Sequence, residues 1–480
     1  MRHTAFVLLP IAFAALAATS ASGKSTSLTL LYTASAQGQI RSCNCTKFRF
    51  GGYGRELSLL KTIRGQCPDS ILVEGGDLVE WTGFQARLKT EVAGRAMRLL
   101  GYQALVPGEN EIGRPGDRSI HHFDPKSVPI VCANFTCSPP PASSASGRDG
   151  RKVPPFSVRP YVLLKTRSGL KVAVVGLIGR SVGRAFQEED FRRAVSDPVE
   201  ALRRILPQVR PKCDLAVVVY HGPVAEAEKL AIKGVDLVLA AHRSTREVLF
   251  PEKPANEIEA PVRSANGAVI IGAETHENWS LGRVDLDLDS HGRIALARHK
   301  LIYLDRHYPE APAMLAVYED YNRKVEAAVL SAAGEFRSKA EAMLAGRGLN
   351  LVEMRKRLRK SPFATAERCK TCHTQIHESW SKTRHAHAMA TLERTHQDYD
   401  PECITCHATG VLARNGFTNR RDTPDLANVQ CEACHGPGLA HAESPAKGYG
   451  KVEEQTCRSC HTDERTPEFD FETAREKIKH

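Results

Sequence analysis

Short apolar runs alternate with longer amphipathic stretches through the first two thirds of the chain. Five of these runs are rich in Val, Ile and Leu and end near Gly, Asp or His; they occupy positions 70–77, 171–179, 214–222, 235–243 and 267–274. Apolar runs of this length, bounded by turn residues, are typical of strands that are buried on both faces of a sheet. The pattern therefore predicts a layered α/β architecture with functional residues at the strand ends.

The pattern changes after about residue 308. Apolar residues recur at near-helical spacing between 312 and 344, and they predict the buried face of a helix; they are Leu315, Tyr318, Val325, Val329 and Phe336. A basic run follows over 347–360. Beyond 360 the apolar side chains are too few to build a core, so bound groups must supply most of it. We expect an α/β domain over 23–308, a helical connector over 309–360, and a mostly helical, loop-rich domain over 361–480.

The first 22 residues have the form of a secretory signal peptide. Arg2 precedes an apolar run from Ala5 to Ala18, and small residues follow near Ala21. This run is too short to span a membrane, and no later segment reaches the roughly 18 uninterrupted apolar residues that a spanning helix needs. The sequence therefore predicts an exported, periplasmic protein without a transmembrane segment.

The motif C-x-x-C-H occurs four times in the last third of the chain. This spacing is the attachment site of c-type haem, in which two thiols bind the haem vinyl groups and the His reaches the iron. Four zinc-binding C-x-x-C pairs would not explain why His follows each pair. The sequence therefore predicts four c-type haems, attached at Cys369, Cys372 and His373; Cys403, Cys406 and His407; Cys431, Cys434 and His435; and Cys457, Cys460 and His461.

The stretch from "CKTCHTQIHESWSKTRHAHAM" through "CITCHATGV" to "VQCEACHGPGLAHAES" resembles the tetrahaem cytochromes c that include electron carriers of nitrification. The resemblance covers Phe363 to about His461. It implies that the distal iron ligands come from His385 and His441 first, then from His396 and His387. We expect one helix over Glu378–Met389 that carries distal His, and we interpret His377 and His480 as solvent-exposed.

The order of strand ends between Leu28 and Leu288 resembles the 5′-nucleotidase branch of the calcineurin-like metallophosphoesterases. The G-D motif of that family is present as Gly76-Asp77, and single His residues are kept in "YHG" and "AHRS". Its D-x-H motif is replaced by Ser35 and Gln37, and its G-N-H-E motif reads "GENE".

The resemblance implies that the replaced residues belong mainly to one of two metal sites. That site would consist of Ser35, Gln37, Asp77 and Ser244, and Ser and Gln are poor ligands for Zn²⁺ or Mn²⁺. The other site would consist of Asp77, Glu109, His221 and His242. Two His and two carboxylates suit one Zn, Mn or Fe ion; alternatively these are ordinary strand-end residues of a scaffold.

Hydrolysis by the family's two-metal mechanism is in doubt for a further reason. Asn110 stands where the family has its catalytic His, and a two-metal mechanism needs both ions to hold the attacking and leaving oxygens.

Six of the 14 Cys residues lie outside the four motifs, namely Cys43, Cys45, Cys67, Cys132, Cys137 and Cys213. Cys43 and Cys45 follow the strand end of the altered D-x-H motif. They are candidates for disulfides, which are common in exported proteins, or for a redox or sulfur-handling pair. Cys132 and Cys137 are candidates for a structural disulfide.

These features favour a periplasmic multihaem cytochrome c for electron transfer, whose α/β domain is a scaffold or a site for a small anion or sulfur compound. The alternatives are a metal-dependent hydrolase fused to a cytochrome module and a module that binds a redox partner. The expected partners are a periplasmic electron donor or acceptor protein and the haem-attachment machinery. The formal net charge of +11 does not indicate nucleic acid, because four haems would add about eight propionates.

Overall fold

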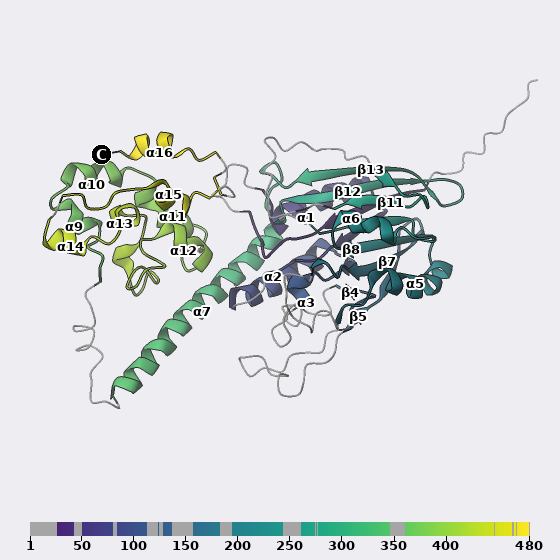
Figure 1. Ribbon diagram of the computed structural model, residues 1–480, viewed down its shortest axis with the longest axis horizontal. Helices are drawn as coiled ribbons and strands as arrows, with labels where there is room; N and C mark the ends of the chain where they lie inside the picture. The colour runs from purple at the N-terminus through teal and green to yellow at the C-terminus, as the bar shows by residue number, and fades with distance from the viewer. Residues whose placement is uncertain are drawn as a thin grey trace, which may run out of the picture.

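The computed structural model of the chain describes residues 26–42, 50–79, 84–112, 123, 128–136, 157–182, 194–242, 261–273, 275, 277–345, 361–445, 447–462, 465–466 and 468–479. Figure 1 shows an α/β domain and a domain of short helices, with one long helix running between them. The expected signal peptide lies outside the described residues.

The α/β domain contains two sheets. The first has seven strands in the order β13-β12-β1-β2-β3-β4-β5. Their bounds are β1 Ser27–Thr33, β2 Ser70–Glu74, β3 Ala104–Leu105, β4 Ile130–Val131, β5 Val158–Arg159, β12 Ser280–Leu288 and β13 Ile294–Tyr303. Strands β1 to β5 pair in sequence order and run parallel, and β12 joins β1 antiparallel, with Leu30 opposite Val284.

The second sheet has six strands in the order β10-β11-β9-β8-β7-β6. Their bounds are β6 Tyr161–Lys165, β7 Lys171–Ile178, β8 Leu215–His221, β9 Leu237–Ala240, β10 Val262–Arg263 and β11 Val269–Gly272. The four central strands are parallel and the two edge strands are antiparallel. The five strands predicted from apolar runs are therefore confirmed as β2, β7, β8, β9 and β11.

Alternate side chains of the strands build two different layers of core, as the two-residue period of a strand requires. Leu30 and Tyr32 of β1 pack with Val174 of β7 between the two sheets. Leu31 of β1 faces the opposite way, toward the helices that cover the first sheet. Ala173 of β7 likewise faces the helices on the second sheet. The domain is therefore an α/β/β/α sandwich, in agreement with the layered architecture that the sequence predicted.

The outer layers are formed by helices that bury one face each. Helices α1 (Tyr53–Gln66), α2 (Phe84–Leu100) and α7 (Pro312–Ala345) cover the first sheet. Helices α5 (Pro198–Val209) and α6 (Val224–Ala227) cover the second, and α3 (Glu109–Ile112) follows β3. Short 3₁₀ turns occur at Arg210–Lys212 and Glu228–Leu230.

Helix α7 carries the chain from one domain toward the other. Its first half buries Met314, Tyr318, Tyr321 and Val325 against α1 and α2. The predicted apolar face is thus correct at Tyr318 and Val325 and wrong at Leu315, which is exposed because it lies on the side away from α2. The predicted basic run lies outside the described residues.

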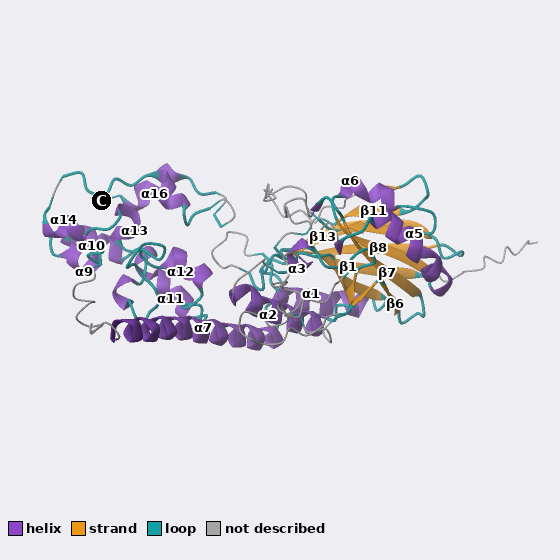
Figure 2. Cartoon of the chain, turned by 60° about the horizontal axis from the view of Figure 1, so that its bottom comes forward, coloured by secondary structure: helices purple, strands orange, loops and turns teal. Residues whose placement is uncertain are grey.

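The C-terminal domain consists of short helices joined by turns (Figure 2). These are α9 Ala366–Lys370, α10 Thr374–Ser381, α11 Ala388–Glu393, α12 Pro401–His407, α13 Cys431–His435, α14 Leu439–Glu443, α15 Glu454–Arg458 and α16 Phe471–Ile478, with 3₁₀ turns at His385–His387 and Pro424–Leu426. One helix was expected over 378–389, but turns divide it between α10 and α11. The apolar cluster of this domain is small, as the sequence indicated.

Within the described ranges, no helix combines the length and the apolar character needed to cross a membrane. The domain bounds expected from the sequence remain predictions.

Candidate functional sites

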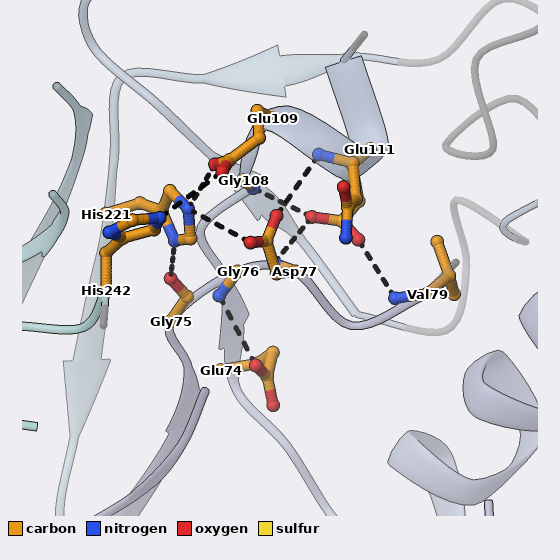
Figure 3. A network of polar contacts seen from close by, with 11 residues as sticks. Glu74, Gly75, Gly76, Asp77, Val79, Gly108, Glu109, Glu111, His221 and His242 are labelled. Atoms are coloured by element: carbon orange, nitrogen blue, oxygen red, sulfur yellow. Dashed lines mark hydrogen bonds and ion pairs between the residues drawn. The ribbon is translucent and has the colours of Figure 1, made fainter. Parts of the chain in front are cut away.

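Four side chains converge where strands of both sheets end (Figure 3). Asp77 follows β2, Glu109 opens α3 after β3, His221 closes β8, and His242 follows β9. One potential ligand atom from each of them lies within 4.8 Å of the others. The fold therefore brings together the four residues that were predicted to hold one metal ion.

The contacts within this group centre on the carboxylate of Glu109. His221 Nε2 lies 2.7 Å from Glu109 Oε2, and His242 Nε2 lies 3.2 Å from Glu109 Oε1. Asp77 Oδ2 lies 3.7 Å from His221 Nε2. His221 and Asp77 are buried, whereas Glu109 and His242 are partly accessible. The group is thus open on the side of Glu109 and His242.

The hydrogen bonds of His221 require a proton or a metal ion at this point. Its Nδ1 donates to the carbonyl of Gly75 at 2.7 Å, so in a neutral ring Nε2 carries a lone pair. That lone pair would face two carboxylates. Either a proton, on Nε2 or on a carboxyl group, or a metal ion must therefore lie between His221 and the carboxylates. A set of two His and two carboxylates fits Zn, Mn or Fe.

The electrostatics of the group agree with this requirement. Burial alone would lower the pKa of His221, but the Asp77 and Glu109 carboxylates raise it to about 10. Burial raises the pKa of Asp77 to about 6. Burial would also raise the pKa of Glu109, but His221 holds it well below its usual range. The group therefore holds a positive charge at neutral pH, from a proton or from a metal.

Ser35 and Gln37, which were predicted to lack metal-binding side chains, lie in a tight turn beside Asp77. Ser35 and Gln37 have positive φ of 52° and 46°, and Asp77 has 54°. Ser35 N donates to the Gly76 carbonyl at 2.7 Å, and Gln37 N donates to the Asp77 carbonyl at 2.8 Å. Left-handed backbone costs energy for residues other than Gly. The hydrogen bonds to the Gly76 and Asp77 carbonyls therefore hold a turn of unfavourable backbone conformation, while Ser244 lies outside the described residues.

Glu111 supports the site and was not identified from the sequence. Its buried carboxylate accepts hydrogen bonds from the amides of Asp77, Val79 and Gly108, at 2.9, 3.1 and 2.8 Å. These bonds tie the loop after β2 to the loop after β3. The "GENE" motif contained this residue, but its role depends on contacts 32 to 34 residues away in sequence.

A chain of buried hydrogen bonds lies behind the metal-site candidates. Glu74, Thr33, Tyr102 and Glu56 are linked in that order; Thr33 Oγ1 lies 2.5 Å from Tyr102 OH, and Tyr102 OH lies 2.6 Å from Glu56 Oε1. Each of the three hydrogen bonds needs one hydrogen atom. The hydroxyl groups of Thr33 and Tyr102 supply two of them. One of the two carboxyl groups must therefore be protonated. Burial raises the pKa of Glu74 to about 8 and that of Glu56 to about 7.

The C-terminal domain brings imidazole rings together in two pairs. The ring centres of His373 and His441 are 6.4 Å apart, and those of His385 and His461 are 6.3 Å apart. A His nitrogen lies about 2 Å from a metal that it binds and about 1 Å from its ring centre, so two rings on opposite sides of one iron are separated by about 6 Å. Each pair contains one His of a C-x-x-C-H motif, so the arrangement fits a haem iron between the rings.

The other two motif His residues are oriented by backbone carbonyls. His407 Nδ1 donates to the Ala388 carbonyl at 2.7 Å, and His435 Nδ1 donates to the Gly450 carbonyl at 2.6 Å. Such bonds fix the tautomer and leave Nε2 available to a metal, as is typical of metal-bound His.

The four motifs lie next to one another in the fold. The side chains of Cys369 and Cys431 are in contact, and so are those of Cys406 and Cys460. The first motif is therefore beside the third, and the second beside the fourth. Cys434 and Cys457 also interact, which connects the third motif to the fourth.

The remaining candidates are less closely grouped. His387 and His396 are exposed. His377 is 9% exposed, so its interpretation as a solvent-exposed residue was wrong; it packs beside Trp380. His480, Cys43, Cys45 and Cys137 lie outside the described residues. Of the remaining non-motif cysteines, Cys67, Cys132 and Cys213 are free thiols.

Comparison with known proteins finds relatives of two different kinds for this chain. A family profile described as "Cytochrome c554 and c-prime" matches residues 368–436. Cytochrome c-554 of Nitrosomonas europaea is 34% identical over 93 residues, which are 16% of this chain and 40% of that protein. The 5′-nucleotidase of Bos taurus is 26% identical over 293 residues, which are 58% of this chain and 48% of that protein.

Among solved structures, a 5′-nucleotidase precursor from Thermus thermophilus aligns with 63% of this chain and 59% of its own, at 20% identity and a TM-score of 0.49. The chain spans about half or less of the length of the curated relatives named above. It is a fusion of a domain similar to the 5′-nucleotidase-type metallophosphoesterases with a C-terminal domain similar to cytochrome c-554.

Proposed function

We propose that this chain is an exported multihaem cytochrome that transfers electrons, with the α/β domain as a scaffold that can also hold one metal ion. The two imidazole pairs, His373 with His441 and His385 with His461, carry this proposal, because their spacing fits axial ligation of iron. The similarity to cytochrome c-554 over 93 residues supports it independently.

Bound at these motifs, haem iron supplies one-electron chemistry. The chain's own residues determine where and how it is held. The Cys pairs would attach the haem covalently, and the motif His residues would bind its iron. His441 and His385 would each supply a second nitrogen ligand to one haem, which would favour fast electron exchange. The bonds from His407 and His435 to carbonyls orient those rings.

The four haems would lie close enough together to form one chain for electron transfer, because the third attachment site also adjoins the fourth. The contacts between Cys369 and Cys431, and between Cys406 and Cys460, bring each attachment site next to another. Electrons could then pass between neighbours without leaving the domain. The donor and acceptor are expected to be periplasmic redox proteins, in keeping with the signal peptide predicted at 1–22 and with haem attachment outside the cytoplasm.

Changing the two candidate distal ligands tests this function. Holoprotein matured with the haem-attachment machinery should contain four haems by pyridine haemochrome assay. The two haems held by the imidazole pairs should be low-spin. His441→Ala and His385→Ala should each convert one haem to the high-spin form while four haems remain attached. His307→Ala is the control, because His307 is exposed in the α/β domain. Unchanged spin states in both variants would contradict the proposed ligands.

A second candidate function is metal-dependent hydrolysis in the α/β domain, and the geometry of Asp77, Glu109, His221 and His242 favours it specifically. These residues would hold one Zn, Mn or Fe ion, which would polarise a bound anion. The replaced residues Ser35 and Gln37 argue against a second ion and so against ordinary nucleotide hydrolysis. A third interpretation, a module that binds a redox partner, needs no metal at all.

Elemental analysis of the holoprotein separates these interpretations. About one Zn, Mn or extra Fe per chain, lost in His242→Ala, would support the mononuclear site. A phosphatase assay with Mn²⁺ on the same two proteins then tests hydrolysis. Four irons and no further metal would favour the scaffold or partner-binding role.

A further inference from the structure

The α/β domain contacts the C-terminal domain at one haem motif in particular. Gln85 Nε2 of α2 donates to Asp400 Oδ1 at 2.6 Å, and Lys89 Nζ lies 2.5 Å from Glu402 Oε1. Lys89 is 4% exposed and Asp400 is 6% exposed. Asp400 caps α12, and the helix continues directly into Cys403, the first cysteine of the second motif. In both Figure 1 and Figure 2, α11 and α12 lie beside α7.

Arg41 brings a positive charge to the same place. Its guanidinium donates to Asn322 Oδ1 at 3.4 Å, and Asn322 Nδ2 donates to the Thr395 carbonyl of the C-terminal domain at 3.0 Å. The guanidinium also lies 5.9 Å from the centre of the Tyr318 ring. Arg41 interacts electrostatically with both Cys403 and Asp400. It is therefore held by residues of α7 at the place where the two domains meet, and its charge acts on the start of the second motif.

We propose that the haem attached at Cys403, Cys406 and His407, here named the junction haem, is the haem on which the α/β domain acts, and that Arg41 and Asp400 set its reduction potential with opposite signs. This inference rests on the proposed haem attachment. It makes the α/β domain a determinant of the driving force for electron transfer at that haem.

The signs follow from charge. Reduction adds one negative charge to the haem, so a nearby cation favours the reduced form and a nearby anion favours the oxidised form. Arg is charged at any accessible pH. At a separation on the order of 10 Å and an effective dielectric constant of about 20, one unit charge changes the reduction equilibrium by about tenfold. A tenfold change is about 59 mV for a one-electron couple.

Two substitutions, one that removes a positive charge and one that removes a negative charge, test the proposal. Arg41→Gln should lower the midpoint potential of one of the four haem components by about 59 mV, the tenfold change above. Asp400→Asn should raise the potential of the same component by a similar amount. Asn also caps helices well, so this variant keeps the start of α12. Both are measured on the holoprotein by redox titration followed in the visible haem spectrum.

The haem component is identified by a His407→Met background. Met ligation raises the potential of a c-type haem, so the junction haem should separate from the others. The Arg41→Gln shift must then fall on that separated component. Arg298→Gln is the matched control, because Arg298 is half-exposed on β13 and should shift no component.

The possible outcomes are distinct. Opposite shifts of one component, the one displaced by His407→Met, support the proposal. Shifts of both variants in the same direction would indicate a change of solvent exposure and would overturn the proposal. Four unshifted components, or shifts of a component other than the junction haem, would also overturn it. If the protein holds no haems to titrate, the proposed function itself fails.

Discussion

Replacing Glu74 by Gln should remove much of the pH dependence of stability that the buried carboxyl chain creates. In the folded protein, Glu74 shares a proton with Thr33, Tyr102 and Glu56, and its other oxygen accepts from Gly76 N at 3.3 Å. A Gln side chain can make the same bonds, because its oxygen can accept from Gly76 while its NH₂ group donates to Thr33. The variant therefore resembles the protonated acid at every pH.

The magnitude follows from the pKa of Glu74, which burial raises from 4.5 to about 8. Because the folded-state pKa is higher than the unfolded one, Glu74 stabilises the fold fully below about pH 4.5. This stabilisation is lost as the pH rises to about 8. Each pKa unit corresponds to about 1.4 kcal/mol, so the shift amounts to an upper value of about 5 kcal/mol in the free energy of unfolding.

Urea unfolding of the holoprotein at pH 5 and pH 8.5, followed by far-ultraviolet circular dichroism, measures this effect. Wild type should be less stable at pH 8.5 than at pH 5, and Glu74→Gln should reduce that difference by at least half. Glu228→Gln, at an exposed position, should keep the wild-type difference. The conclusion that this hydrogen-bond chain holds a carboxyl proton at Glu74 would be refuted by either of two results. One is a Glu74→Gln variant that keeps the wild-type difference in stability between pH 5 and pH 8.5. The other is a variant that is less stable than wild type at pH 8.5.

Three further changes test other parts of the structure. Gly176→Ala should destabilise the sandwich by about 1–3 kcal/mol in urea unfolding, because a Cβ there would lie 1.9 Å from the Val131 carbonyl oxygen; an unchanged midpoint would contradict the packing of β7 on β4. Asp197→Ala should cost about 1 kcal/mol, because the Asp197 carboxylate caps α5 through two amides at 2.9 Å, and Asp197→Asn should restore most of the loss. Tyr32→Phe should cost about 1–2 kcal/mol by removing the 2.6 Å bond to buried His299, which thermal unfolding would reveal as a lower Tm.

Local patterns in the sequence determined the elements and the haem motifs. Runs such as 171–179 and 214–222 became buried strands because they are short and rich in Val, and a strand in a covered parallel sheet buries consecutive apolar residues on both faces. The C-x-x-C-H motif needs no tertiary information, because its three reactive groups lie within five consecutive residues. The order of strand ends also indicated which four residues would meet at the metal-site candidate.

Tertiary structure decided what lies between distant segments. The sequence named His385 and His441 as distal candidates, but only the fold pairs His385 with His461 and His441 with His373. The burial of His377 and the support of the site by Glu111 also depend on neighbours far along the chain. The same holds for the shared proton between Glu74 and Glu56, and for Arg41 at the second haem motif. Each depends on segments that pack together although they are far apart in sequence, and desolvation of a side chain is a property of the packed molecule that no local pattern records.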